Sequence, residues 1–374
     1  MRKVIKAFIV YAQKLKLRRL ILLMSLIGIM TTKAVPSWCD IYSWTLYPKI
    51  ESLLASLSCL VPFAIGDVFI LFSIVWIISY PVYAYRKRRM SKATIAGNVI
   101  EYIMWVYVWF YASWGLNYSQ PNIYSRIGMK RVTFSHDEFK SFAYAYADSL
   151  NKTFMSDKSI NIHATDSIVR HGYQEMPWRT MGINSAAAIR PNSKPMLLSW
   201  LSSMAGVTGS MSPFFGEFTL NTDLRPHEFP ATYAHEYAHQ LGIANEGEAN
   251  FYSYMVCTNS HDRAVRFSGY YSILFHVLAQ VHGLLGETEY NEYIKCLRTE
   301  VRDLAESDRR YWTAKRSRLV DETQNFFYNI YLHGNNVDEG MKSYAGVVGH
   351  IMAWERYCAS TWRARNASDS NDYS

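Results

Sequence analysis

Two histidines, His235 and His239, lie four positions apart with Glu236 between them in the run His235-Glu236-Tyr237-Ala238-His239. On a helix, residues at i and i+4 share one face, so both imidazoles can bind the same metal ion. A glutamate in this position can act as general base on a metal-bound water. The pattern predicts a hydrolytic zinc centre with His235 and His239 as metal ligands and Glu236 as the catalytic base.

A catalytic zinc site usually holds a third protein ligand, and the candidates after the histidines are Asn245, Glu246 and Glu248. If the helix continued straight, Glu246 would lie roughly 10 Å beyond the histidines, because each residue adds about 1.5 Å. We therefore expect the helix to break at Gly242 and a second helix to start near Asn245. Glu246 is the predicted third ligand and Asn250, four residues later, the support of a metal-bound histidine. Glu248 remains the alternative ligand, whereas the amide of Asn245 is a poor one.

Composition and charge narrow the class of protein. Of the 374 residues 49% are hydrophobic and 19% are charged, with a net charge of +8. The basic residues gather at the N-terminus and in Arg86-Lys87-Arg88-Arg89, next to apolar segments, which is typical of membrane topology signals. With no DNA-binding pattern, we expect no nucleic-acid partner. The five cysteines show no CxxC spacing, which argues against a cysteine zinc site.

Three apolar segments predict a membrane region over residues 1–116, with spans at about 20–35, 66–85 and 99–116. The first segment also fits a cleaved signal peptide ending near Ala34. The positive charges predict that the N-terminus and the 86–92 loop are cytoplasmic. We therefore expect residues 117–365 to form a domain outside the cytoplasmic membrane, with the lipid bilayer as a partner.

The rest of the chain reads as mainly helical with a small sheet. Ser135 and Glu138 form a capping-box pattern for a helix to about Lys152, and residues 158–190 suggest strands and loops. Residues 195–204 suggest a helix, and the second half of 212–221 alternates like a strand. Such a strand could be the edge strand against which zinc peptidases lay their substrate, or a plain structural strand. Further helices are predicted over 248–258, 268–282, 287–307, 312–332 and 340–361, and disorder over 366–374.

The motifs resemble two related groups of proteins. Glu246-Gly247-Glu248-Ala249-Asn250 after the histidines is similar to the second motif of gluzincins, the thermolysin-like zinc peptidases. More closely, the chain resembles a bacterial family of membrane-bound proteins catalogued as domain of unknown function 3810. The matching segments are 62–67, 114–118, 213–217, 235–242, 246–250 and 343–344. The resemblance implies a zinc-dependent peptidase with an α+β, zincin-like domain, but no substrate. Glu246 follows His239 by only seven positions, a shorter connection than in thermolysin-like enzymes, which leaves Glu246 and Glu248 both open as ligand.

These observations predict a membrane-anchored zinc metallopeptidase that hydrolyses proteins or peptides on the outer side of the cytoplasmic membrane. Tyr344, His350 and His333 are possible donors to the developing oxyanion, among which the sequence does not choose. One alternative is a non-catalytic membrane sensor or assembly protein whose outer domain is stabilised by a metal. An intramembrane protease is disfavoured, because the surroundings of the histidines are too polar for a lipid-embedded helix. A further alternative is a pair of buried structural histidines.

Overall fold

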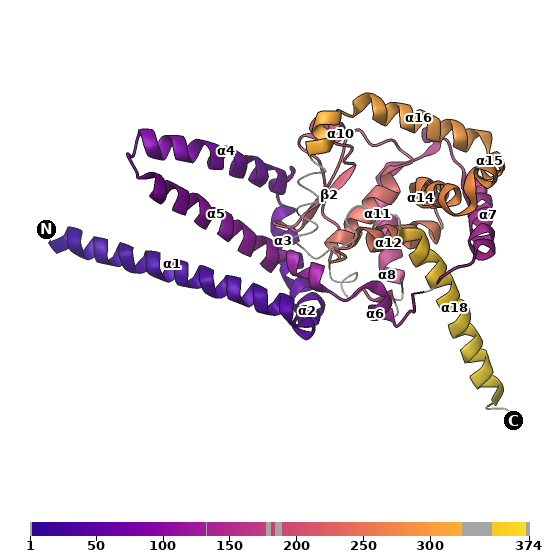
Figure 1. Ribbon diagram of the computed structural model, residues 1–374, viewed down its shortest axis with the longest axis horizontal. Helices are drawn as coiled ribbons and strands as arrows, with labels where there is room; N and C mark the ends of the chain where they lie inside the picture. Colours follow the sequence, from indigo (N-terminus) through magenta and orange to yellow (C-terminus); the bar gives the residue numbers. More distant parts are fainter. Residues whose placement is uncertain (1, 132, 177–180, 184–188, 324–345, 372–374) are drawn as a thin grey trace.

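The computed structural model describes residues 2–131, 133–176, 181–183, 189–323 and 346–371. Three long helices extend together from a mostly helical body, with the N-terminus at their far end (Figure 1). They are α1 (Arg2–Ala34), α4 (Ile65–Arg86) and α5 (Lys92–Ser113). The body holds all three strands and the remaining long helices. The expected combination of helices with a small sheet is therefore present.

Among the described residues, two helices are long and apolar enough to cross a membrane, namely α4 and α5. A third span exists only if the part of α1 from Lys16 is counted together with the segment Pro36–Ser58, from which it is bent by 106°. The protein is thus membrane-associated through two or three helices. The helix predicted over 99–116 begins and ends earlier, at Lys92 and Ser113. Ser91 caps its start by accepting a hydrogen bond from the Thr94 N–H at 3.2 Å, and a 3₁₀ turn, η2 (Gly115–Ser119), follows its end.

The bent segment connects the membrane helices to the body. It comprises α2 (Pro36–Ile41), the π-helical turn η1 (Tyr42–Leu46) and α3 (Tyr47–Ser58). One face of α3 is buried, through Tyr47, Glu51, Ala55 and Ser58, as the helical spacing allows. Tyr47 belongs to the same buried core as residues of the body, together with Trp114 from the end of α5. The hydrophobic core therefore runs across the predicted boundary at residue 116.

The sheet has three short strands, β1 (Ser193–Pro195), β2 (Gly209–Ser212) and β3 (Glu217–Leu220), in the order β1-β3-β2. β1 is parallel and β2 antiparallel to β3, with Gly209 opposite Leu220 and Ser212 opposite Glu217. The strand expected before the metal helix is β3. It is the central, completely buried strand of the sheet and not an edge strand. The edge positions belong to β1 and β2, and the hairpin turn places β2 beside β3 on the antiparallel side.

The described helices of the body follow one another along the chain as α6 (Ile123–Ile127), α7 (His136–Thr153), α8 (Thr165–Glu175), α10 (Ser199–Met204), α11 (Phe229–Gln240), α12 (Glu246–Thr258), α13 (Arg263–Ser272), α14 (Leu274–Gln280), the π-helical turn η5 (Val281–Leu285), α15 (Gly286–Cys296), α16 (Thr299–Lys315) and α18 (Gly346–Asn371). Short 3₁₀ turns, η3 (Asp157–Ser159) and η4 (Ile162–Ala164), precede α8. The capping box at Ser135 is confirmed, because its hydroxyl accepts from the Glu138 N–H at 3.2 Å.

Several predicted boundaries are wrong. Helix α8 occupies part of the region read as strands and loops, and its strongly amphipathic face packs on the body. The helix expected from Pro195 begins only at Ser199, because residues before it form β1. The helix expected over 268–282 is divided at Ile273. Helix α16 continues to Lys315, through the break expected between the helices predicted over 287–307 and 312–332. Part of 312–332 lies outside the described residues. Helix α18 continues to Asn371, into the tail for which disorder was predicted.

Candidate metal centre

The histidines lie on α11, whose limits follow from local sequence. Pro230 occupies its first turn, where the missing N–H costs no hydrogen bond. Gly242, at φ +93°, turns the chain back after the helix ends. Asn245 then caps α12, since its side chain accepts from the Glu248 N–H at 3.0 Å. The break at Gly242 and the new helix from Asn245 are as the sequence predicts, and they bring Glu246 back toward α11.

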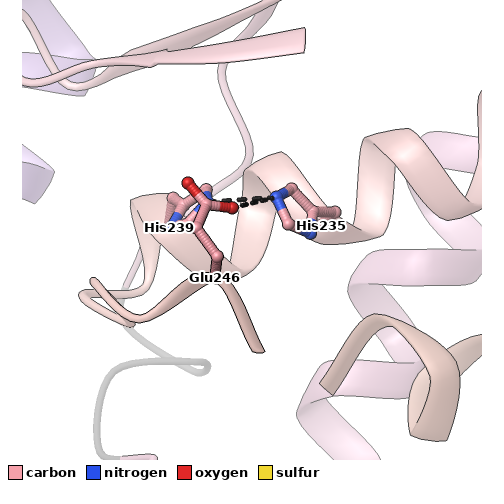
Figure 2. Close-up of side chains that lie close together, drawn as sticks. All are labelled: His235, His239 and Glu246. Carbon is pink, nitrogen blue, oxygen red and sulfur yellow. Dashed lines mark hydrogen bonds and ion pairs between the residues drawn. The ribbon is translucent and has the colours of Figure 1, made fainter. Parts of the chain in front are cut away.

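Three side chains converge on one point (Figure 2). The Nε2 atoms of His235 and His239 are 3.1 Å apart. Glu246 Oε2 lies 3.2 Å from His235 Nε2 and 3.4 Å from His239 Nε2. All three groups are buried or half-buried, and together they form a cluster that could hold a metal ion.

The spacing of these three atoms can be compared with what zinc requires. Ligands bound at 2.0–2.1 Å in a tetrahedral arrangement lie about 3.3 Å from one another. The three observed separations fall between 3.1 and 3.4 Å. Two imidazoles and one carboxylate are also a donor set that catalytic zinc uses, with the fourth position left for water. The residues present therefore fit a zinc ion in number, chemistry and spacing.

The orientation of His239 is set by a backbone group. Its Nδ1 lies 2.6 Å from the carbonyl oxygen of Ile243, so Nδ1–H can donate there and Nε2 is left facing the cluster. We expected this support from Asn250. Among the described residues, His235 Nδ1 and Asn250 Nδ2 are both buried without a hydrogen-bond partner, and His239 Nδ1 faces the Ile243 carbonyl, so Asn250 orients neither histidine through these atoms.

Glu248, the alternative ligand, is engaged elsewhere. Its Oε2 accepts from Arg126 Nη2 at 2.6 Å and its Oε1 from the Ile123 N–H at 2.8 Å. Both partners of the Arg126–Glu248 pair are at least nine-tenths buried. The two carboxylates, which are two positions apart on α12, therefore face different parts of the molecule. The structure places Glu246, and not Glu248, beside the histidines.

Glu236 lies against β2, one of the two edge strands of the sheet. It is buried, and burial raises the pKa of its carboxyl group. Its Oε2 has no hydrogen-bond partner among the described residues. A Cβ on Gly209 would lie 2.5 Å from Glu236 Oε1, so only glycine lets β2 approach the carboxylate this closely.

The cluster is strongly coupled electrostatically. Burial alone would lower the pKa of His239, but the neighbouring Glu246 carboxylate raises it to about 9. Burial alone would raise the pKa of Glu246, and the two imidazoles hold it well below its ordinary range. Each group is thus stabilised by opposite charge on its neighbour. The buried Glu246 carboxylate favours positive charge at this point, which a bound metal cation would also supply.

Sequence reasoning missed one histidine near this site. Half-buried His276 on α14 lies near His235. Burial lowers the pKa of His276, and the neighbouring His235 lowers it further. Of the donors named from sequence, His350 contacts Tyr124, with 3.0 Å between Nδ1 and the hydroxyl oxygen, while His333 and Tyr344 lie outside the described residues. No motif marked His276, because only the packing of α14 brings it here.

Side chains from the membrane end of the chain hold the last turn of α11. The Tyr47 hydroxyl donates to the Gln240 carbonyl oxygen at 2.6 Å, and Trp114 Nε1–H donates to that of His239 at 2.9 Å. Gln120 Nε2–H donates to the Gly242 carbonyl oxygen at 2.9 Å. Carbonyl groups at a helix end have no partner within the helix, so these donors satisfy groups that would otherwise be orphaned.

A second cluster of titratable groups precedes α11. His227, completely buried, lies between Asp157 Oδ1 at 2.6 Å and Asp308 Oδ2 at 2.9 Å. Arg225 pairs with the same two carboxylates. These contacts occupy both imidazole nitrogens and raise the pKa of His227 to about 9 against the opposing effect of burial. The cluster is therefore a hydrogen-bonded ion group that attaches the start of α11 to η3 and α16.

The fold and the cluster define a membrane-associated, mainly helical protein with a candidate three-ligand metal centre. The chain matches the family model described as "Protein of unknown function (DUF3810)" over residues 42–352 and belongs to that family. The match begins at Tyr42, so it includes η1 and α3 of the bent segment, the helices α4 and α5 and the candidate site. No curated protein and no solved structure matches the chain.

Proposed function

We propose that this protein is a membrane-anchored zinc metallopeptidase with a zincin-like active site. The observation that carries the proposal is the convergence of His235, His239 and Glu246 at 3.1 to 3.4 Å from one another. A pair of structural histidines would not need a carboxylate returned by a second helix. The buried Glu236, on the same helix as the two histidines, adds the base that peptide hydrolysis requires.

Each residue of the site has a separate role in this proposal. His235, His239 and Glu246 would hold the ion, and zinc bound there lowers the pKa of its water toward about 7 and polarises the peptide carbonyl. Glu236 accepts the proton of the attacking water at its carboxylate and passes it to the leaving amine. His276 is our candidate for the additional hydrogen-bond donor to the developing oxyanion. The strand β2 approaches Glu236 closely at Gly209 and forms one wall of the site.

We infer the side of the membrane from the distribution of charge. The basic loop after α4 and the basic N-terminus lie at the end of the helices away from the body (Figure 1). Because positive loops stay in the cytoplasm, this arrangement supports a body on the outer side of the cytoplasmic membrane. Proteins or peptides of the cell envelope are then the expected substrates.

The test uses the full chain purified in detergent. We expect close to one zinc per chain in the wild type, loss of zinc in His235→Ala and Glu246→Gln, and retention in Glu248→Gln. A degenerate peptide library should be cleaved by the wild type, and Glu236→Gln should abolish cleavage while it keeps the metal.

Two results would overturn the proposal. One is a folded wild type that binds no zinc. The other is a zinc-loaded protein whose library cleavage is absent or is unchanged by Glu236→Gln. Zinc without turnover would favour the alternative, a metal-stabilised sensor or assembly protein. Thermal unfolding of every variant ensures that folded proteins are compared.

A further inference from the structure

The edge strand β2 connects the candidate site to the membrane helices. At its first residue, Gly209, it lies against Glu236. At its last residue, Ser212, it lies against Gly66, where a Cβ would come within 1.8 Å of the Ser212 hydroxyl oxygen. Gly66 is the second residue of the membrane helix α4. Three steps along a strand cover about 10 Å. The site is therefore about 10 Å from the start of a membrane helix, measured along β2.

The turn that follows β2 is anchored between the two membrane helices. Trp109 Nε1–H of α5 donates to the Phe214 carbonyl oxygen at 2.9 Å. The ring of Phe69 on α4 lies 5.0 Å from that of Phe214 and 5.6 Å from that of Phe215. Phe69 and Trp109 both lie inside the segments that are apolar enough to cross a membrane. The Ser212 end of β2 is thus held beside α4 and α5, within the segments that are apolar enough to cross a membrane.

Exposed apolar side chains surround the same end of the strand. On and next to α10, which precedes β2, Leu197 is 45% and Trp200 63% exposed. The N–H of Leu197 donates to the Asp67 carboxylate of α4 at 2.8 Å, which fixes it at the level of that helix start. Phe63, just before α4, is 48% exposed. Tryptophan and other large apolar residues at this level are typical of contact with the membrane interface.

The other edge of β2 is available for strand addition. Asn221 N–H donates to the Thr208 carbonyl oxygen at 2.9 Å. Hydrogen-bonded pairs alternate in an antiparallel ladder, so the backbone groups of Gly209 and Met211 point away from β3. Among the described residues β2 pairs with β3 alone. An extended polypeptide can therefore add to β2 with one peptide bond beside Glu236 and its following residues directed to Ser212.

We propose, as a consequence that rests on the peptidase function above, that the substrate is a polypeptide anchored in the same bilayer. It is cut in an extended segment within about four residues of the membrane surface, a distance set by the length of β2 at about 3.3 Å per residue. A chain lying along β2 reaches the ends of α4 and α5 after three residues. At that point a membrane anchor continues it directly into the bilayer.

The test reconstitutes the full chain in liposomes with three synthetic probes. The first carries a membrane-spanning Leu/Ala helix joined directly to a degenerate 12-residue stalk with a terminal fluorophore. The second has eight prolines between helix and stalk, a stiff spacer of about 25 Å. The third is the soluble stalk alone. Cleavage rates are measured by fluorescence release and cut positions by mass spectrometry.

We expect the first probe to be cut within about four residues of its helix and at least ten-fold faster than the second. Membrane tethering is common to both, so the difference isolates the distance from the bilayer. Equal rates for the first two probes, or cuts far from the helix, would overturn the substrate assignment while the peptidase function stands. Cleavage of none of the three by zinc-loaded protein would overturn both.

A variant of the strand tests the route separately. Met211→Pro removes an N–H that points to the free edge and leaves the ladder with β3 intact, and proline is tolerated on edge strands. We expect it to keep zinc and thermal stability but to lose at least ten-fold in cleavage of the first probe, whereas Met211→Leu retains it. Wild-type cleavage by a folded Met211→Pro protein would show that the substrate does not lie along β2.

Discussion

The ion group around His227 makes stability depend on pH in a way that can be calculated. His227 is completely buried and faces Asp157 from η3 and Asp308 from α16, with Arg225 pairing to both. Tyr271 of α13 also donates to Asp308. The pKa of His227 is about 9 in the folded protein, against 6.5 for the free side chain.

A shift of this size corresponds to about 3 kcal/mol in favour of folding at neutral pH, because each pKa unit is worth about 1.4 kcal/mol. The folded pKa is raised, so the contribution is fully present below pH 6.5 and is lost as the pH rises through 9. For domains of 150–250 residues, 1 kcal/mol shifts Tm by about 2–4 °C. The protonated imidazole should therefore raise Tm by roughly 6–12 °C.

The perturbation is His227→Gln, which keeps a hydrogen-bond donor and removes the charge. We expect its Tm in detergent to be lower than that of the wild type at pH 6.5 and the gap to shrink steadily toward pH 10. Comparing the two proteins at each pH cancels the titration of other groups. His282→Gln is the matched control, since His282 pairs with Glu287 at 2.8 Å on the surface and should give no gap.

A Tm difference between wild type and His227→Gln that stays constant from pH 6.5 to pH 10 would refute the reasoning. It would mean that His227 is not protonated between the two carboxylates. A gap that widens with pH would be equally contradictory, because it would require the neutral imidazole to be the stabilising form. Far-UV circular dichroism shows whether each protein is folded before melting.

Three further substitutions separate the roles of nearby residues. Tyr47→Phe leaves the buried Gln240 carbonyl without its donor and should cost about 1–3 kcal/mol, measured as a lower Tm than wild type. Glu248→Gln disrupts the buried pair with Arg126 and should cost about 3 kcal/mol, while zinc content measured by mass spectrometry stays at the wild-type value. His276→Ala should lower kcat by about 10²-fold with zinc retained. An unchanged kcat would show that His276 does not donate to the oxyanion.

Sequence reasoning succeeded where the signal is local. The break at Gly242, the cap at Asn245 and the return of Glu246 each depend on residues within about a dozen positions of the histidines. Glycine after a helix and asparagine at the start of the next are conformational requirements that any surrounding fold must respect. Helix geometry then leaves few places for the third carboxylate.

The errors at the site concern contacts that no local sequence pattern specifies. The edge strand β2 has the sequence Gly-Ser-Met-Ser, which shows no apolar alternation, so only its pairing with β3 identifies it. Asn250 has the right helical spacing, but the turn after Gly242 presents the Ile243 carbonyl to His239 first. The proximity of His276 to His235 depends on tertiary packing, which no single-sequence pattern encodes.

Contacts between the last turn of α11 and the N-terminal third of the chain help to shape the candidate site. A metal centre needs its ligands held within a fraction of an ångström, and Glu246 reaches the histidines only because α11 ends where it does. The end of α11 is fixed by Tyr47 and Trp114, which lie 193 and 125 positions from their partners. A fragment that begins at residue 117 lacks both donors and leaves buried carbonyl groups of the ligand helix unsatisfied. The family match, which begins at Tyr42 and includes both side chains, is consistent with a site that is built jointly by the membrane region and the body.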